Sequence, residues 1–195
     1  MKKFFYKFLS APQISIVLRR ILENNFKRQK EIIEKHFFVT EGDTVLDLGC
    51  GTGEFSVFFP KKSYVGVDID SKNIEYAKEN YDKKFLVADG KKLPFEDNVF
   101  SKVLVIGVFH HLSDADSQAV LKEIRRVLKP GGKFLVMEDT KNKNPLTALL
   151  HYLDQGEFIR SSKNWYDMFS KEWKVLQNFT FQNRICFYSA FLLEQ

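Results

Sequence analysis

Short apolar runs alternate with amphipathic stretches through the central part of the chain. The apolar runs have the length of strands and are bounded by glycine, proline or aspartate, whereas apolar residues recur at helical spacing in the stretches between them. We expect strands at residues 44–48, 64–67, 85–88, 100–107 and 133–137. We expect helices between them at residues 54–59, 71–81 and 114–128. Strands that alternate with helices in this way predict a parallel sheet.

Both ends of the chain depart from this alternation. Residues 12–37 carry apolar side chains at helical spacing, and Asn24 and Asn25 divide them into two expected helices. Two further helical stretches are expected at residues 146–153 and 165–169. The last two strand-like runs are joined by only three residues, and so short a join requires an antiparallel hairpin. These two runs cover residues 174–181 and 185–193.

The pattern predicts a single α/β domain, because a chain of 195 residues fits one domain. We divide it into an N-terminal helical arm, a ligand-binding core, an insertion and a C-terminal hairpin. These four parts cover residues 1–39, 40–139, 140–172 and 173–195. A hydrophobic content of 44% and a charged content of 28% are typical of a soluble globular protein. We expect no membrane span, because the chain holds no apolar run of about 18 residues.

Charge and cysteine content add two expectations. The net charge of +5 belongs to the arm, since residues 1–39 carry nine Lys or Arg and three Glu. Within residues 1–9, aromatic side chains stand among lysines, which suits peripheral membrane contact as an alternative to simple packing. Lys7 interrupts the apolar run there, so we expect no signal peptide. Cys50 and Cys186 lie far apart, and a reduced, cytoplasmic protein is the simpler interpretation.

The most informative stretch covers residues 45–55, where an apolar strand runs into three glycines. Gly49, Gly51 and Gly53 remove side chains from the turn, so a ligand can lie against the backbone there. A helix after the turn would add a positive dipole end. Asp47 stands just before the first glycine, and its carboxylate would repel a pyrophosphate but attract an ammonium or sulfonium group. The stretch therefore favours a cationic nucleoside over a dinucleotide.

Acidic residues also end the next two expected strands. Asp68 has two acceptor oxygens that suit the two hydroxyls of a ribose, and Ile69 offers an apolar face to a base. Asp89 could accept a hydrogen bond from an adenine amino group. The alternatives are that Asp68 caps the following helix and that Asp89 forms an Asx-turn.

Several of these stretches resemble the class I S-adenosylmethionine-dependent methyltransferases. The matching segments are VLDLGCGTGEF at residues 45–55, VGVD at 65–68, ADG at 88–90 with LPF at 93–95, HHL at 110–112 and LKPGG at 128–132. Together they are most similar to the small-molecule subgroup that includes the ubiquinone and menaquinone methyltransferases. The resemblance implies a Rossmann-like three-layer sandwich with a mostly parallel seven-stranded sheet, whose last strand is antiparallel. It also implies an enzyme that binds S-adenosylmethionine.

The resemblance further implies which residues hold the cofactor. Asp47 and Gly49 would hold its methionine end, Asp68 its ribose, and Ile69 and Asp89 its adenine. The full expected set is Asp47, Gly49, Cys50, Gly51, Gly53, Asp68, Ile69, Asp89, Gly90, Ile106 and Gly107. No metal site is expected.

Methyl transfer by direct displacement needs a base only where the acceptor loses a proton. His110 and His111 are the candidates, because a neutral imidazole takes up a proton near pH 7. Acceptor contacts are expected outside the matching segments. Tyr152, Phe158 and Trp165 would wall an apolar acceptor, and Arg160 would bind a carboxylate or phosphate. Packing against the arm is the alternative for these side chains.

Other functions remain open from the sequence. The basic arm would suit an RNA methyltransferase, although nucleic acid is disfavoured because the Asn/Asp-Pro-Pro-Tyr and Pro-Cys motifs of base methylation are missing. A cofactor-binding protein without catalysis is a second alternative. A nicotinamide-dependent oxidoreductase is disfavoured by the glycine spacing and by Asp47. A small-molecule acceptor is the expected partner.

Overall fold

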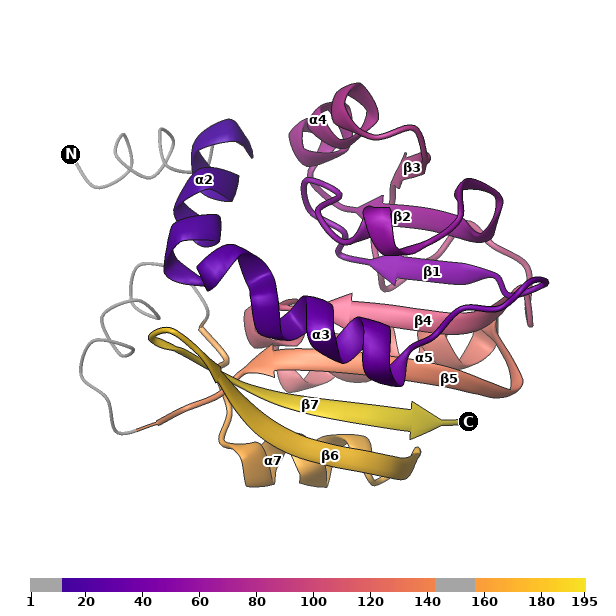
Figure 1. Cartoon of the computed structure of the whole chain (residues 1–195). Helices are drawn as coiled ribbons and strands as arrows, with labels where there is room; N and C mark the ends of the chain where they lie inside the picture. The colour runs from indigo at the N-terminus through magenta and orange to yellow at the C-terminus, as the bar shows by residue number, and fades with distance from the viewer. Residues whose placement is uncertain (1–11, 143–156) are drawn as a thin grey trace.

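A seven-stranded sheet forms the centre of the molecule, in the order β3-β2-β1-β4-β5-β7-β6 (Figure 1). The computed structural model describes residues 12–142 and 157–195. All strand pairs are parallel except those of β7, which is antiparallel to both β5 and β6. The strands are β1 (Val45–Leu48), β2 (Tyr64–Asp68), β3 (Lys84–Val87), β4 (Phe100–Ile106), β5 (Leu128–Asp139), β6 (Lys174–Asn183) and β7 (Cys186–Glu194). The predicted fold class is therefore confirmed.

Helices cover both faces of this sheet and enclose two apolar cores (Figure 1). On one face, α5 (Asp114–Val127) and α7 (Ser162–Phe169) bury a core that contains the stacked rings of Trp165 and Phe169. The other face is covered by α2 (Pro12–Leu22), α3 (Lys27–His36) and α4 (Ser71–Asn80). No helix within residues 12–142 or 157–195 has the length and apolar character needed to cross a membrane.

The N-terminal arm bends where the asparagines predicted it. A 3₁₀ turn, η1 (Asn24–Phe26), separates α2 from α3, and its three residues have positive φ angles of 49°, 54° and 57°. Asparagine tolerates this left-handed region better than most residues. The bend lets both helices contact the C-terminal hairpin: Arg184 Nη1 donates to the carbonyl of Ile21 at 2.7 Å. Within the described residues, the arm thus packs against the rest of the domain from Pro12 onward.

Two expected elements differ in the structure. The helix predicted at residues 54–59 is wrong, because only a 3₁₀ turn, η2 (Ser56–Phe58), forms there. Gly53 at φ +82° and Pro60 leave room for fewer than two helical turns, and burial of Phe55 and Phe59 fixes the chain in an irregular path. No helix dipole from residues 54–59 therefore points at the glycine turn.

The fifth strand starts at Leu128 instead of residue 133, since Leu128 already pairs with Phe100. The helix expected at 146–153 lies outside the described residues.

The strand order predicts a ligand crevice between β1 and β4. From β1 the chain proceeds outward to β2 and β3, and it then returns to the other side of β1 as β4. In open α/β sheets, ligands bind beyond the carboxyl ends of the strands at such a switch point. The glycine turn after β1 and the loop after β4 both stand at this edge.

Candidate functional site

The loops that follow β1 and β4 pack directly against each other. Gly49 has a φ of +74°, and a Cβ on it would lie only 2.2 Å from Cγ2 of Val108. Gly107, at the end of β4, also has a positive φ, of +69°. Any side chain at position 49 would separate the two loops. The first glycine is therefore required by close packing as well as by backbone conformation.

Asp68 lies against the glycine turn, as the sequence predicts. Its Oδ2 accepts a hydrogen bond from the backbone N–H of Gly51 at 2.8 Å, and its Oδ1 accepts one from the N–H of Asp70 at 2.8 Å. Burial raises the pKa of this carboxyl, while those two backbone donors oppose the increase. The neighbouring Ile69 is 71% exposed. The two side chains thus present acceptor oxygens and an apolar surface beside bare backbone.

Asp47 is placed differently from its predicted role. It is 2% exposed and lies beneath the turn, where Tyr64 Oη donates to its Oδ2 at 2.7 Å. Burial raises its pKa from 3.8 to about 7, although the Tyr64 hydrogen bond opposes the increase. This burial does not favour the direct ligand contact predicted for Asp47. The carboxyl instead accepts the hydroxyl hydrogen bond of Tyr64, on the neighbouring strand β2.

The raised pKa makes Asp47 a source of pH-dependent stability. Its folded form holds a proton more tightly than the unfolded chain, so its contribution is complete below about pH 4 and is lost as the pH rises through about 7. Asp47→Asn cannot ionise and can still accept from Tyr64. We expect this variant to exceed the wild type by roughly 2–4 kcal/mol in unfolding free energy at about pH 8, with a smaller difference at about pH 5. Urea denaturation at both pH values measures this, and a difference independent of pH would contradict it.

The remaining predicted cofactor residues fall into exposed and buried groups. Asp89 is exposed, and its Oδ1 accepts from the N–H of Lys91 at 2.9 Å, which is the Asx-turn alternative. Gly90 lies close to the first glycine turn, since a Cβ on it would stand 3.3 Å from Cδ2 of Leu48. Cys50 and Ile106 are each 6% exposed and pack into the core under α2, α3 and α4. Burial raises the pKa of the Cys50 thiol.

His110 is held by a carboxylate that the sequence analysis did not select. Glu138, at the end of β5, is fully buried, and its Oε2 lies 2.8 Å from Nδ1 of His110. The same carboxylate accepts backbone hydrogen bonds from Val108, Phe109 and His110, at 2.9, 2.8 and 3.2 Å. With Glu138 as an acceptor for this contact, the ring proton is assigned to Nδ1, and Nε2 is then the basic nitrogen. His111, in contrast, is exposed, and its ring centroid lies 4.0 Å from that of His110.

Arg160 contacts protein groups with its whole guanidinium. It donates to Asp114 Oδ1 from Nε and Nη2, and to the carbonyls of Phe109, Phe158 and Leu112 from Nη1 and Nη2. Its Cζ also lies 4.7 Å from the ring centroid of Trp165. These five hydrogen bonds match the five donors of an arginine side chain. The geometry favours a clamp on the loop that carries His110 over the predicted anion site.

The other predicted acceptor residues differ in their exposure. Trp165 is completely buried, and its Nε1 donates to the carbonyl of Asp139 at 3.0 Å, so it packs in the core and is no wall of an open site. Phe158 is 37% exposed, and its N–H donates to the carbonyl of His110 at 2.9 Å. Tyr152 lies outside the described residues. Of the two described residues that were predicted to wall an apolar acceptor, only Phe158 offers surface to a ligand.

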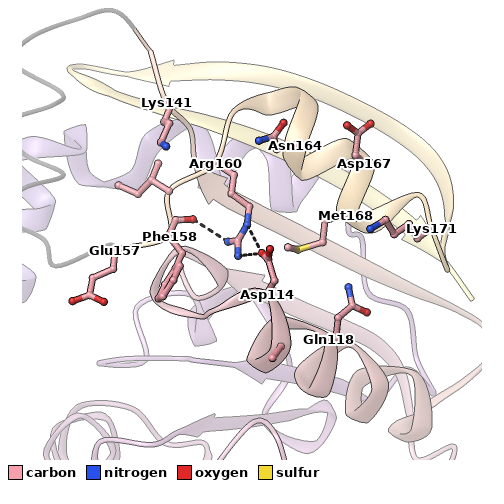
Figure 2. A pocket seen from close by; sticks show the side chains of 12 residues that line it. Asp114, Gln118, Lys141, Glu157, Phe158, Arg160, Asn164, Asp167, Met168 and Lys171 are labelled. Carbon is pink, nitrogen blue, oxygen red and sulfur yellow. Dashed lines mark hydrogen bonds and ion pairs between the residues drawn. The ribbon is translucent and has the colours of Figure 1, made fainter.

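A hollow of about 830 Å³ lies between the start of α5 and α7 (Figure 2). Figure 2 shows Arg160 and Asp114 paired across its centre, with Phe158 and Glu157 at one end and Lys171 at the other. None of its twelve lining residues belongs to the glycine turn. The hollow is therefore separate from the crevice between β1 and β4.

Sequence reasoning missed two charged residues of the site. Glu138 ends a parallel strand with a carboxylate, which is the same signal that selected Asp68 and Asp89, and it could have been found in that way. Arg19, on α2, has its Nη2 only 3.9 Å from the point where a Cβ on Gly107 would stand. Nothing in the local sequence distinguishes Arg19 from the other basic residues of the arm.

The central part of the chain is similar in sequence to known methyltransferases. Residues 46–136 match the family described as the methyltransferase domain. A ubiquinone/menaquinone biosynthesis C-methyltransferase of Chromobacterium violaceum is 37% identical over 135 residues, which cover 60% of this chain and 54% of the relative. A probable tRNA methyltransferase 9B of Mus musculus is 35% identical over 96 residues, which cover 49% of this chain and 21% of the relative. The chain thus spans about half the length of the first relative and about a fifth of the second.

A solved structure extends the likeness beyond the matched core. The crystal structure of a protein from Pyrococcus horikoshii OT3 superposes with a TM-score of 0.69 at 25% identity. The superposition covers 87% of this chain and 91% of that protein. The likeness therefore extends beyond residues 46–136, which the family model matches.

Proposed function

We propose that this chain, which belongs through residues 46–136 to the class I S-adenosylmethionine-dependent methyltransferases, transfers a methyl group from S-adenosylmethionine to a small-molecule acceptor. The observation that carries the proposal is Asp68 at the glycine turn. Its carboxylate stands beside bare backbone and an exposed Ile69, at the switch point of the sheet. A ribose and an adenine ring need this combination of acceptor oxygens and apolar surface.

The described residues suit the parts of the cofactor. Asp68 would accept from the ribose hydroxyls, and Ile69 with Asp89 would contact the adenine. The methionine end would extend toward Gly49 and Gly107, where the two loops meet. Glycines at both positions add no side chain of their own to this path.

The cofactor supplies an electrophilic methyl group bound to a sulfonium. When bound, it would give this methyl group to a nucleophile of the acceptor by direct displacement and leave as S-adenosylhomocysteine. The protein has to align the acceptor and exclude water, which supplies up to about 7–11 kcal/mol in well-oriented systems. No covalent intermediate with the protein is needed.

His110 would take the proton of an acceptor that loses one on methylation. The carboxylate of Glu138 holds its ring proton on Nδ1 and stabilises the imidazolium that forms, so Nε2 serves as the base. The clamp of Arg160 on the carbonyls of Phe109 and Leu112 keeps this loop in place. We prefer His110 to His111 because Nδ1 of His110 lies 2.8 Å from the buried carboxylate of Glu138, whereas His111 is exposed.

The acceptor itself is proposed from the relatives. The Chromobacterium violaceum relative is named for C-methylation in quinone biosynthesis, which suggests an aromatic small molecule for this chain. The mouse relative is named as a probable tRNA methyltransferase, and the basic residues of the arm keep RNA as the second candidate. The residues that decide between them lie in the arm and in the insertion, outside the matched core.

A methyl-transfer screen tests the proposal. The protein is incubated with S-adenosylmethionine labelled on the methyl group and, in separate reactions, with quinone precursors, small acids, lipids and RNA. We expect label in the quinone or small-acid pool. Label in RNA alone would show that the acceptor is RNA and not a small molecule. Calorimetry accompanies the screen, and tighter binding of NADH than of S-adenosylmethionine would reject the function. Cofactor binding without transfer to any pool would indicate a non-catalytic binding protein.

A further inference from the structure

The strand β6 forms one outer edge of the sheet (Figure 1). Within residues 12–142 and 157–195, its only strand partner is β7. An edge strand offers the backbone N–H and C=O groups of its free side to a further strand, and β6 is ten residues long. The strand at the other edge, β3, has only four residues and begins with Lys84. Short, charged edges resist added strands, so β6 is the edge that is open to pairing.

The sequence of β6 lacks most of the features by which proteins block an exposed edge. Residues 175–183 include no charged residue, no proline and no glycine. A register shift between Val175 and Gln177 marks a bulge, which limits regular pairing near the start of the strand. From Gln177 to Asn183 the register with β7 is uninterrupted. Residues 177–183 are therefore a regular, uncharged stretch at the free edge.

This stretch is chemically symmetric about its central residue, Thr180. Its sequence is QNFTFQN, so a phenylalanine stands on each side of Thr180 and two amide residues follow in both directions. Antiparallel pairing of two copies about a two-fold axis at Thr180 brings the two threonines opposite each other. The same axis brings Phe179 opposite Phe181 of the second copy and amides opposite amides. Threonine pairs and aromatic pairs stabilise neighbouring strands, and amides both donate and accept, so the stretch complements itself.

The side chains that hold β6 in the domain leave one face of this stretch exposed. Phe179 contacts His36 of α3, with 5.4 Å between the ring centroids, and Phe181 stacks on Tyr188 at 5.2 Å. The alternate residues of the strand, 178, 180 and 182, are exposed and point to the other face. A strand added in the plane of the sheet would therefore extend this exposed face and leave the contacts with α3 in place.

We propose that two copies of this chain associate through β6, antiparallel about a two-fold axis at Thr180, so that their sheets join into one. Each copy uses its β6 edge in the same contact, so assembly stops at the dimer. Two strands, β5 and β7, separate β6 from β4, so the interface lies away from the crevice between β1 and β4. The inference does not depend on the proposed methyl transfer.

Analytical ultracentrifugation of the whole chain tests the association. We expect the wild type to be mainly a dimer at roughly 10 μM, as an interface with a low-micromolar Kd would give. Thr180→Lys places two ammonium groups opposite each other at the axis and should raise the dimer Kd by roughly 10- to 100-fold. Val87→Lys is the matched control, because it adds the same charge to β3 at a position that is 53% exposed, and it should dimerise as the wild type does.

Three results of this experiment would overturn the inference. They are a wild type that stays monomeric up to about 100 μM, an unchanged Kd in a folded Thr180→Lys, and growth into species larger than the dimer. Circular dichroism shows whether each variant is folded.

Disulfide formation tests the register independently of Thr180→Lys. Oxidised Thr180→Cys should give a covalent dimer, because directly opposite Cβ atoms lie about 4.5–5.5 Å apart. Asn178→Cys and Gln182→Cys should remain unlinked alone and should link to each other when mixed. Oxidised wild type measures the background from Cys50 and Cys186. A link in Asn178→Cys alone, or the absence of any link above the background, would contradict the axis at Thr180 and overturn the inference.

Discussion

His110→Ala is expected to lower kcat by roughly 10²- to 10⁴-fold with an acceptor that loses a proton. The expectation follows from the hydrogen bond between Nδ1 and the buried Glu138, which leaves Nε2 as the basic nitrogen. Binding of S-adenosylmethionine should change by less than about threefold, because a general base contributes to the reaction step and little to ground-state binding. Initial rates and single-turnover rates with labelled cofactor measure the first effect, and calorimetry measures the second.

The matched variant is His36→Ala, which removes an imidazole from α3, where it contacts Phe179. It should retain wild-type turnover. His111→Ala tests the competing assignment, since this exposed ring lies beside His110. A full loss in His111→Ala with normal turnover in His110→Ala would transfer the role to His111. Normal turnover in both variants would remove general-base catalysis from the mechanism.

Glu138→Gln examines how His110 is positioned. An amide still fills the space but its nitrogen cannot accept from Nδ1, so the ring proton is no longer fixed on that atom. We expect kcat to fall while KM for the acceptor stays nearly constant. Nitrogen NMR of labelled histidine should show the Nδ1-protonated tautomer in the wild type and a mixture in the variant. A loss of folding stability with an unchanged tautomer would show that Glu138 only supports the loop.

The sequence could predict those parts of the site that depend on one strand and its following turn. Asp68 is an example, because an acidic residue at the end of an apolar run must lie at the carboxyl edge of a parallel sheet. Gly49 is another, since its spacing alone indicated backbone contact. The parallel central strands followed from the alternation, and the hairpin followed from the short join at Arg184. In each case the information is contained in a few consecutive residues.

The parts that failed depend on distant partners. Arg160 has the chemistry of an anion site, but Asp114 and three carbonyls from other segments take up its donors. Arg19 looks like a surface charge of the arm until the bend at η1 brings α2 to the end of β4. The helix expected after Gly53 has suitable residues, yet the burial of Phe55 and Phe59 outweighs their helix propensity. The pattern of neighbouring residues in the sequence does not show which distant groups will contact them in the folded chain.

Asp68→Ala is expected to weaken S-adenosylmethionine binding by roughly 10²- to 10⁴-fold. Each hydrogen bond between a ribose hydroxyl and a carboxylate is worth about 1.5–3 kcal/mol, and two such bonds would be lost. The variant also frees the N–H of Gly51, which now donates to Asp68 Oδ2 at 2.8 Å, so the glycine turn would lose a fixed point as well. Isothermal titration with S-adenosylmethionine and S-adenosylhomocysteine measures the effect, and both ligands should weaken equally because they share the ribose.

Two further variants separate the contact with the ribose from the support of the turn. Asp68→Asn keeps one acceptor oxygen and a side chain of the same size, so it should lose less affinity than Asp68→Ala. Asp82→Ala removes a carboxylate that pairs with Lys61 on the surface, and it should bind both ligands as the wild type does. If Asp68→Ala binds 2′-deoxyadenosine and adenosine with the same ratio as the wild type, the carboxylate does not contact the ribose. In that case Asp68 holds only Gly51, and the ribose contact has to come from another residue at the edge of the sheet.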